Sequence, residues 1–289
     1  MTKFASSNAA FAAMRLMLVL AFVVTTGLLP ARAVEEPWVG ATNSKLRLFG
    51  GMAKTKEGEQ LMAGIELRMD DGWKTYWRNP GDSGVPPQFD WSGSTNLKEA
   101  KVLYPAPHRF IDANITSIGY SGEVVFPVRL TPERPGEPIE LKLAFDFGLC
   151  KSLCIPNQAK LSLKLAPGAI LNEADAKILN ASLDRVPRPV ALGALPAIGK
   201  IEAKLDAEKP SIVIEALFPP GVAGTDLFVD LADGTYVPVP TVLGRLSDGK
   251  QSFAVNFMSK DEAKDIKAKT LSLTLVSDRG SRETVWKAE

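Results

Sequence analysis

The sequence predicts a mainly β protein: a β-sandwich followed by a second, smaller mainly-β domain. Two observations support this fold class. Apolar and polar residues alternate over many short stretches, which is the period-two pattern of half-buried strands. Turns rich in glycine and proline separate about seven such stretches before residue 167, as is typical of a sandwich. After a helical segment, similar stretches resume and continue to the end of the chain.

The first 33 residues have the features of a secretory signal peptide. Lys3 and Arg15 precede an apolar run over residues 16–29, and Ala31 and Ala33 form a small-x-small cleavage site. A membrane-spanning helix needs about 20 apolar residues, which this run does not reach. We therefore expect cleavage after Ala33, export, and a mature chain that does not span the membrane.

Composition narrows the possible functions. The 34 basic residues nearly balance the 33 acidic ones, and no basic cluster is interleaved with aromatic residues, so nucleic acid is not expected as a partner. His108 is the single histidine, which argues against most metal-enzyme, Ser-His and Cys-His schemes; we expect it in a loop. The two cysteines, Cys150 and Cys154, would reach an oxidising space, where an even pair is usually bonded or redox-active.

The first domain, residues 34–167, begins with a series of predicted strands. Residues 45–49 and 61–69 alternate in polarity. Residues 72–91 are rich in aromatic residues, glycine and proline and have no helical period, so we expect an ordered loop whose large side chains fill the core or line a ligand groove. Prolines make 102–107 an edge-like segment, and 118–130 contains a further strand.

The two cysteines are predicted to lie at the end of a hairpin. Residues 139–147 and 161–165 alternate in polarity, so 151–153 should form the turn, with one cysteine on each arm. Residues four apart in one extended strand would be separated by about 13 Å, which is too far for a disulfide. Facing residues of a hairpin are close enough. The pair can therefore bond only if the chain reverses between its two members.

Besides a redox-active pair, three interpretations of the cysteines stay open from the residues alone. The first is a purely structural disulfide, although closing a five-residue loop contributes only roughly 2 kcal/mol and is a poor choice for stability alone. The second is a pair of reduced, buried cysteines, which an oxidising compartment disfavours. The third is a site in which the two thiolates hold a soft metal ion such as Cu(I) or Zn.

A linker and a second β domain follow. In residues 168–200 we expect a helix capped by Asn172, with acidic residues in its first turn, that ends before Pro187 and Pro189, and then a proline-rich linker. Residues 201–289 should form the second domain, which we expect to serve packing or partner binding. A capping box over 259–262 predicts a short helix in it. Its expected strands cover 201–205, 211–217, 226–231, 251–257, 271–276 and 283–286.

Three motifs occur in the order found in a known family. They are the aromatic segment 72–91, the segment 119–128, and the cysteine segment Phe147-Gly-Leu-Cys-Lys-Ser-Leu-Cys-Ile-Pro156. Together they resemble the periplasmic N-terminal domain of the protein-disulfide reductase DsbD, and within that family the suppressor-of-copper-sensitivity branch. The resemblance covers residues 38–165 and extends more loosely over the second β domain.

This resemblance implies that the first domain is an immunoglobulin-like β-sandwich and that the chain is a periplasmic thiol-disulfide exchange protein. Its cysteine pair would receive electrons from a membrane-embedded partner and pass them to oxidised thioredoxin-fold proteins. Cys154 would form the mixed disulfide and Cys150 would resolve it. The family covers its pair with a cap loop, and the matching stretch contains Ile118 and Tyr120. Exchange of this kind requires no metal or other cofactor.

The sequence also departs from the full reductase. After the signal peptide it shows no membrane-spanning segment, no thioredoxin-like domain and no C-x-x-C motif, so we expect a stand-alone exported protein whose electron donor is a separate protein. The three-residue gap between the cysteines is shorter than in some family members. Two alternative functions remain: a redox-inactive binding or scaffold module with a structural disulfide, and a periplasmic copper-handling protein that contributes to copper tolerance.

Overall fold

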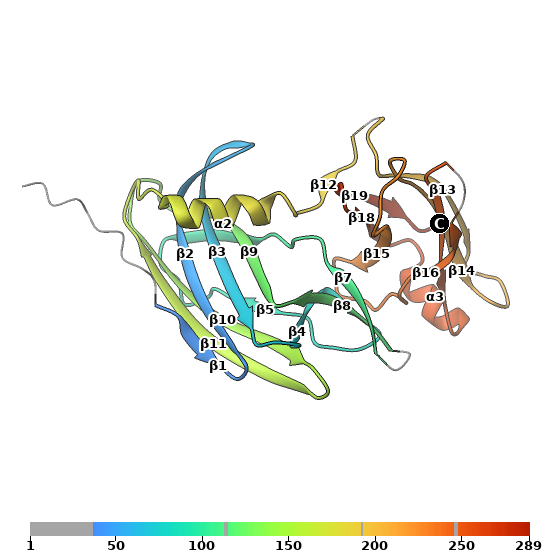
Figure 1. The fold of residues 1–289 in the computed structure, drawn as a ribbon, viewed down its shortest axis with the longest axis horizontal. Helices are drawn as coiled ribbons and strands as arrows, with labels where there is room; N and C mark the ends of the chain where they lie inside the picture. Colours follow the sequence, from blue (N-terminus) through green and yellow to red (C-terminus); the bar gives the residue numbers. More distant parts are fainter. Residues whose placement is uncertain (1–36, 113–114, 192, 246–247) are drawn as a thin grey trace, which may run out of the picture. The chain divides into compact units, whose positions relative to one another are not determined.

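The chain folds mainly into β-strands, as Figure 1 shows, which confirms the predicted fold class. The computed structural model describes residues 37–112, 115–191, 193–245 and 248–289. The expected signal peptide and its cleavage site after Ala33 lie outside these residues. No helix in the described ranges is long and apolar enough to cross a bilayer.

The first sheet of the N-terminal sandwich is antiparallel and has the strand order β1-β2-β3-β9-β6. β2 and β3 pair along their whole length, so both extend well beyond the short alternating segments predicted for them. β6 lies at one edge and ends at Val102, where the proline-containing edge segment was expected. The strands are β1 (Val39–Ala41), β2 (Ser44–Thr55), β3 (Gly58–Met69), β9 (Glu123–Pro132) and β6 (Leu97–Val102).

The second sheet has the order β11-β10-β4-β8-β7, and a short strand, β5, also pairs with β10. The predicted cysteine hairpin is β10 and β11, which pair from Ile139 and Leu165 at one end to Cys150 and Cys154 at the other. The strands are β4 (Lys74–Gly81), β5 (Gln88–Asp90), β7 (His108–Asp112), β8 (Ile115–Ser121), β10 (Ile139–Cys150) and β11 (Cys154–Leu165).

Alternating apolar residues of the two sheets form one hydrophobic core. Along β10, Leu141, Phe145 and Leu149 are fully buried, because every second side chain of a strand points to the same face. Phe145 stacks on Phe89 and on Phe147 with ring centroids 4.7 Å apart in each case. These stacked rings fix the inner face of the hairpin that carries the cysteines.

The prediction of a loop over residues 72–91 is wrong, because Lys74–Gly81 forms β4 and Gln88–Asp90 forms β5. Glycine and proline suggested a loop, and β4 shows no clean alternation because both of its faces are covered: Thr75, Tyr76 and Trp77 are buried in succession. The expected core role of the aromatic residues holds for Trp77, whose side chain is fully buried. His108 begins β7 and does not lie in a loop.

One helix, α2 (Glu173–Leu183), lies on the first sheet against β2 and β9 (Figure 1). As predicted, Asn172 is its N-cap, and its side-chain oxygen accepts a hydrogen bond from the Asp175 backbone at 2.9 Å. Ser182 donates to the Val125 carbonyl at 2.6 Å, which joins the last turn of the helix to β9. These contacts hold the helix on the sheet.

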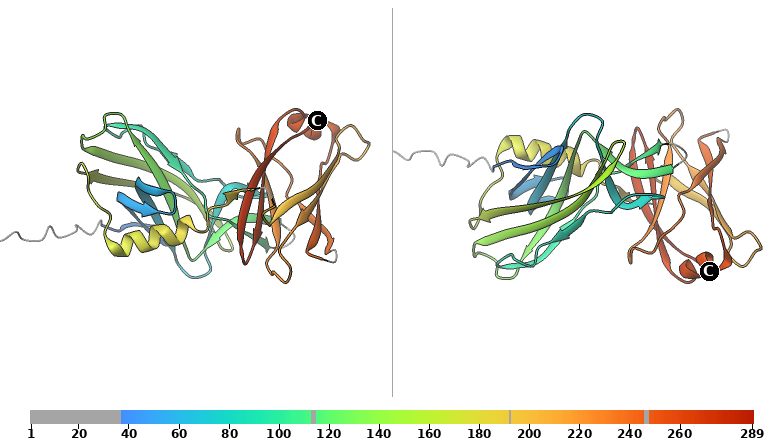
Figure 2. Two further views of the ribbon diagram at one scale, coloured as in Figure 1. Left: turned by 90° about the horizontal axis from the view of Figure 1, so that it is seen from above. Right: turned by 90° about the horizontal axis from the view of Figure 1, so that it is seen from below.

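The C-terminal region contains two further sheets that share a second hydrophobic core (Figure 2). Their orders are β12-β19-β18-β15 and β13-β14-β17-β16. Ser259 caps α3 (Lys260–Ile266), as the capping box predicted. β16 was not predicted. The strands are β12 (Arg188–Pro189), β13 (Ala197–Lys204), β14 (Ser211–Leu217), β15 (Asp226–Leu231), β16 (Thr241–Arg245), β17 (Lys250–Asn256), β18 (Thr270–Ser277) and β19 (Gly280–Lys287).

The two hydrophobic cores are separate, yet Phe228 of β15 belongs to the core of the first sandwich. Contacts between Cα atoms group Glu36–Glu289 into one compact unit. The domain boundaries predicted on either side of residues 168–200 therefore remain a prediction.

Candidate redox site

The two cysteines form a disulfide at the end of the β10–β11 hairpin. They face each other in the register, with Cα atoms 4.0 Å apart, as the predicted chain reversal requires. Cys154 is exposed and lies on β11, the edge strand of its sheet, whereas Cys150 is half-buried on β10. An attacking thiolate from solvent therefore finds Cys154 more accessible than Cys150.

Strand β4 lies directly beside the cysteine-bearing end of β10. Lys74 and Thr75 face Cys150 and Leu149 in the antiparallel register. The Thr75 hydroxyl is buried and donates a hydrogen bond to the Gly148 carbonyl at 2.9 Å. Cys150 is thus held inside the sheet by its neighbour strand, while Cys154 lies at the outer edge.

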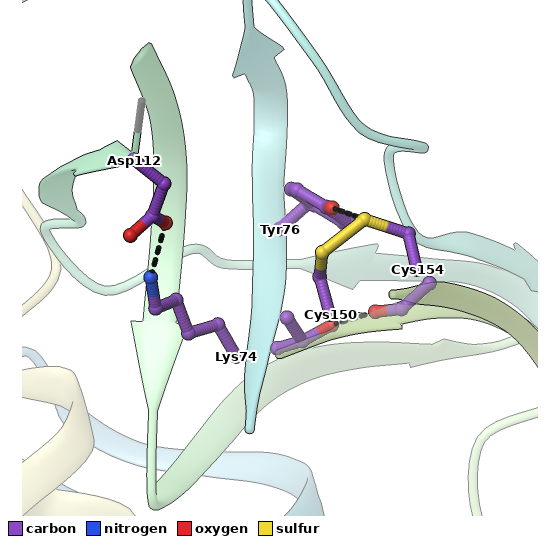
Figure 3. Close-up of a disulfide and its surroundings, with 7 residues drawn as sticks. Lys74, Tyr76, Asp112, Cys150 and Cys154 are labelled. Carbon is purple, nitrogen blue, oxygen red and sulfur yellow. Dashed lines mark hydrogen bonds and ion pairs between the residues drawn. A yellow bond between two sulfur atoms is a disulfide. The ribbon is translucent and has the colours of Figure 1, made fainter. Parts of the chain in front are cut away.

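The side chain of Tyr76 reaches the disulfide from β4. Its hydroxyl lies 3.2 Å from the Cys154 sulfur (Figure 3). Because a disulfide sulfur carries no hydrogen, the hydroxyl is the donor. Burial raises the pKa of Tyr76 above its usual value, so the phenol keeps its proton at neutral pH. A thiolate formed at Cys154 would meet this same donor.

Two glycines leave the space that the Tyr76 ring occupies. A Cβ atom on Gly84 would lie 2.2 Å from a ring carbon, and one on Gly148 would lie 3.0 Å from a carbon of the opposite ring edge. Gly84 also has a φ of 125°, a conformation that other residues rarely adopt. Glycine at both positions therefore lets the ring lie against the hairpin with its hydroxyl at the sulfur.

Two lysines lie near the pair, and both already have partners. Lys74 forms an ion pair with Asp112 of β7, its amine 2.6 Å from the carboxylate, as Figure 3 shows. Lys151, in the turn between the cysteines, donates to the Asp71 carbonyl at 3.0 Å. The ion pair connects the outer end of the β7–β8 hairpin to the residue that faces Cys150.

The expected cap residues do not form a loop. Ile118 and Tyr120 lie within β8, their side chains are almost fully buried in the sandwich core, and the Tyr120 hydroxyl donates to the Pro105 carbonyl at 2.8 Å. Side chains committed to the core in this way cannot cover a disulfide, so the residue match for the cap loop is corrected. The segment of this hairpin that does approach the pair contains Asp112.

Sequence reasoning missed three residues of the site: Lys74, Tyr76 and Asp112. The cysteine pair was found because it is the only one in the chain. Tyr76 was noted as a packing body, and its two neighbouring aromatic residues hid its separate role. Asp112 is one of many acidic residues and carries no local signal, because only the pairing of β4 with β8 and of β8 with β7 brings it to Lys74.

Comparisons with known proteins place this geometry in context. Residues 51–166 match the family model described as "Thiol:disulfide interchange protein DsbD, N-terminal", so the resemblance seen in the motifs is confirmed for the first sandwich. The fold is similar to the crystal structure of the N-terminal periplasmic domain of ScsB from Proteus mirabilis. The TM-score is 0.67 at 22% identity, and the match covers 88% of this chain and 97% of that one. No curated protein sequence matches the chain.

Proposed function

Since residues 51–166 match the N-terminal domain family of DsbD, we propose that this protein relays electrons by thiol-disulfide exchange through Cys150 and Cys154. The observation that carries the proposal is the position of the disulfide. It lies at the exposed end of a hairpin, with its outer sulfur, on Cys154, against the hydroxyl of Tyr76.

The reaction has two halves. In the first, a dithiol donor reduces the pair: a donor thiolate attacks one sulfur of the disulfide, and the second donor thiol then closes the donor's own disulfide. Two electrons and two protons pass to Cys150 and Cys154. In the second half, the Cys154 thiolate attacks an acceptor disulfide and releases one acceptor thiolate. Cys150 then attacks the Cys154 sulfur, releases the second acceptor thiolate and restores the bond.

The roles of the two cysteines follow from their exposure. Cys154 is exposed on the edge strand, where an acceptor disulfide can reach it from solvent. The half-buried Cys150 is better placed to attack Cys154 than an outside disulfide. The Tyr76 hydroxyl would stabilise the Cys154 thiolate by donating a hydrogen bond, which lowers the pKa of a thiol.

The proposed partners are a membrane-embedded donor and a thioredoxin-fold acceptor, both meeting the protein in the periplasm. The match to the DsbD N-terminal family supports this placement. So does the signal-peptide pattern that ends at Ala33. The exchange requires no cofactor, because it breaks and forms only bonds between cysteine sulfur atoms, each of which stays on its own protein.

The first test is the reduction potential of the pair, measured by equilibrating the purified protein with glutathione buffers and trapping its thiols. A value between about −180 and −270 mV, where exchange proteins work, is expected. A value below about −300 mV is typical of structural disulfides. It would refute the relay and favour the alternative of a binding or scaffold module with a staple.

A trapping experiment tests the assigned roles. In Cys150→Ser the resolving thiol is lost, so a mixed disulfide between Cys154 and an oxidised thioredoxin-fold acceptor should accumulate on non-reducing gels. The matched control is Cys154→Ser, which keeps the half-buried thiol and should trap several-fold less. Equal trapping by both variants would contradict the assignment of Cys154 as the attacking residue.

Copper handling has less support. Among the described residues, no histidine, aspartate or glutamate lies with the two cysteines in a group of three that could hold a metal ion. No observation in the structure favours copper handling over exchange.

A further inference from the structure

Strand β15 of the C-terminal region packs on both of its faces. Leu227, Val229 and Leu231 point into the C-terminal core. The residues that alternate with them, Asp226, Phe228 and Asp230, point to the opposite face, because successive side chains of a strand alternate. Phe228 packs in the core of the first sandwich, 5.8 Å from the ring of Trp77. This one strand therefore contributes side chains to both hydrophobic cores.

The alternate face of β15 holds strand β4 just beyond Tyr76. Arg78 donates two hydrogen bonds to the Asp230 carboxylate, at 3.0 and 2.9 Å, and a third to Glu283 of β19. The Asn79 side chain donates to the Val229 carbonyl at 2.8 Å. Paired guanidinium–carboxylate bonds are directional as well as strong. Three consecutive residues of β4, from Trp77 to Asn79, thus contact a single strand.

The same strand also holds β7. Arg109 donates to the two oxygens of Asp226 at 2.9 and 2.7 Å. Three residues further along, Asp112 forms its ion pair with Lys74. The two arginine pairs are mostly shielded, since the side chains of Arg109 and Asp226 are 17% and 18% exposed and that of Asp230 is 8% exposed, whereas the Asp112 side chain is 67% exposed. Shielded pairs hold geometry better than exposed ones, which solvent and salt weaken.

Of the two strands held by β15, β4 reaches the disulfide directly, and β7 is connected to it through an ion pair with β4. On β4, Tyr76 immediately precedes the held residues, and its hydroxyl contacts the Cys154 sulfur. On β7, Asp112 fixes the amine of Lys74, whose backbone faces Cys150. The contacts of β15 with Arg78 and Arg109 therefore restrain two of the groups that surround the disulfide.

We propose that Asp226 and Asp230 of β15 are positioning residues for the redox pair, through which the C-terminal region sets the reduction potential of Cys150 and Cys154. This inference rests on the proposed exchange function and gives the C-terminal region a role in it. The effect operates through Tyr76: when β4 is held, its hydroxyl stays at the sulfur and favours the thiolate of the reduced form. When β4 is released, that stabilisation weakens and the oxidised form gains.

The test compares equilibrium constants for reduction by glutathione in the full chain. Asp230→Asn removes the charge that holds Arg78, and the constant should fall about threefold, with a matching rise in the pH at which Cys154 alkylation reaches half its maximal rate. Asp226→Asn, which releases Arg109, should change the constant in the same direction but less. Asp230→Glu keeps the carboxylate and should recover most of the wild-type value.

The matched control is Asp206→Asn. Asp206 lies in the same C-terminal region and pairs with Lys267 at 2.8 Å, but on an exposed surface with no contact to β4 or β7 among the described residues. It should leave both readouts unchanged. If Asp230→Asn does not fold, Arg78→Lys decides, because it keeps the charge and loses the paired donor geometry.

The outcomes separate the two claims. Folded Asp230 and Asp226 variants whose glutathione constants and alkylation profiles equal those of the control would overturn this inference and leave the relay intact. If the wild-type potential itself lies in the range of structural disulfides, the relay fails first. A loss of stability without a change in either readout would assign β15 a structural role alone.

Discussion

At the scale of single residues, the contact between Tyr76 and Cys154 gives the first prediction about the proposed exchange. Tyr76→Phe removes the hydroxyl that lies 3.2 Å from the sulfur and leaves the ring in its glycine-lined space. We expect the Cys154 thiol of the reduced protein to ionise less readily, so that its alkylation reaches half its maximal rate at a higher pH, because a hydrogen bond to a charged group contributes about 1.5–3 kcal/mol. The pH dependence of iodoacetamide alkylation measures it.

Tyr236→Phe is the control for this change. Tyr236 also has a side-chain hydroxyl that donates to a single partner, but that partner is Asp82, at 3.1 Å. Its loss should leave the alkylation profile of Cys154 where it was. The same alkylation profile in wild type and Tyr76→Phe would show that the hydroxyl does not support the thiolate.

The lone histidine gives a prediction about pH. The side chain of His108 is exposed at the surface, but partial loss of water around the imidazole and the nearby charge of Arg185 lower its pKa. The folded state therefore binds this proton less readily than the unfolded chain, whose histidine titrates near about 6.5. The stability that His108 contributes is present above that pH and is lost as the pH falls through the folded value.

His108→Gln tests this, because no other histidine titrates in the same window. Between pH 7.5 and 5.5, urea unfolding should show a smaller loss of stability in the variant than in the wild type. An equal or larger loss in His108→Gln would place the cause of the pH dependence elsewhere in the chain.

At the scale of elements, the sequence predicted correctly those elements that are stabilised by contacts between residues close together in the chain. The β10–β11 hairpin and the capped helix α2 were predicted because alternation, turn length and the Asn172 cap are written in neighbouring residues. β4 was taken for a loop because its two buried faces remove the polar–apolar alternation, and because glycine and proline occur at its end and just after it. The Lys74–Asp112 and Arg78–Asp230 ion pairs could not be predicted from the sequence, because each joins strands that are far apart in the chain.

The cap of α2 gives a prediction at this scale. Asn172→Ala removes the acceptor for the Asp175 backbone and should lower the free energy of unfolding by about 1 kcal/mol. Asn172→Ser, which can still cap, should recover most of that loss. Chemical denaturation measures both. A stability unchanged in the Ala variant would mean that the packing of α2 on β2 and β9 alone fixes its first turn.

At the scale of the whole molecule, the sandwich should survive reduction of its disulfide. The bond joins the end of a hairpin that pairs along all 12 residues of each strand, and it closes only a short loop. We expect reduction to lower the free energy of unfolding by roughly 2 kcal/mol, with one cooperative transition retained. Denaturation with and without dithiothreitol checks this, and a loss of the folded state on reduction would contradict it.

The double-faced packing of β15 also restricts how the C-terminal region can assemble. A slip of one residue against β18 would exchange the two faces of the strand, because the side-chain period is two. Asp226 and Asp230 would then enter an apolar core, and leucines would face Arg78 and Arg109. The slip would break the ion pairs of both arginines on one face and bury carboxylates in the apolar core on the other. Two independent sets of contacts therefore select the same alignment of β15.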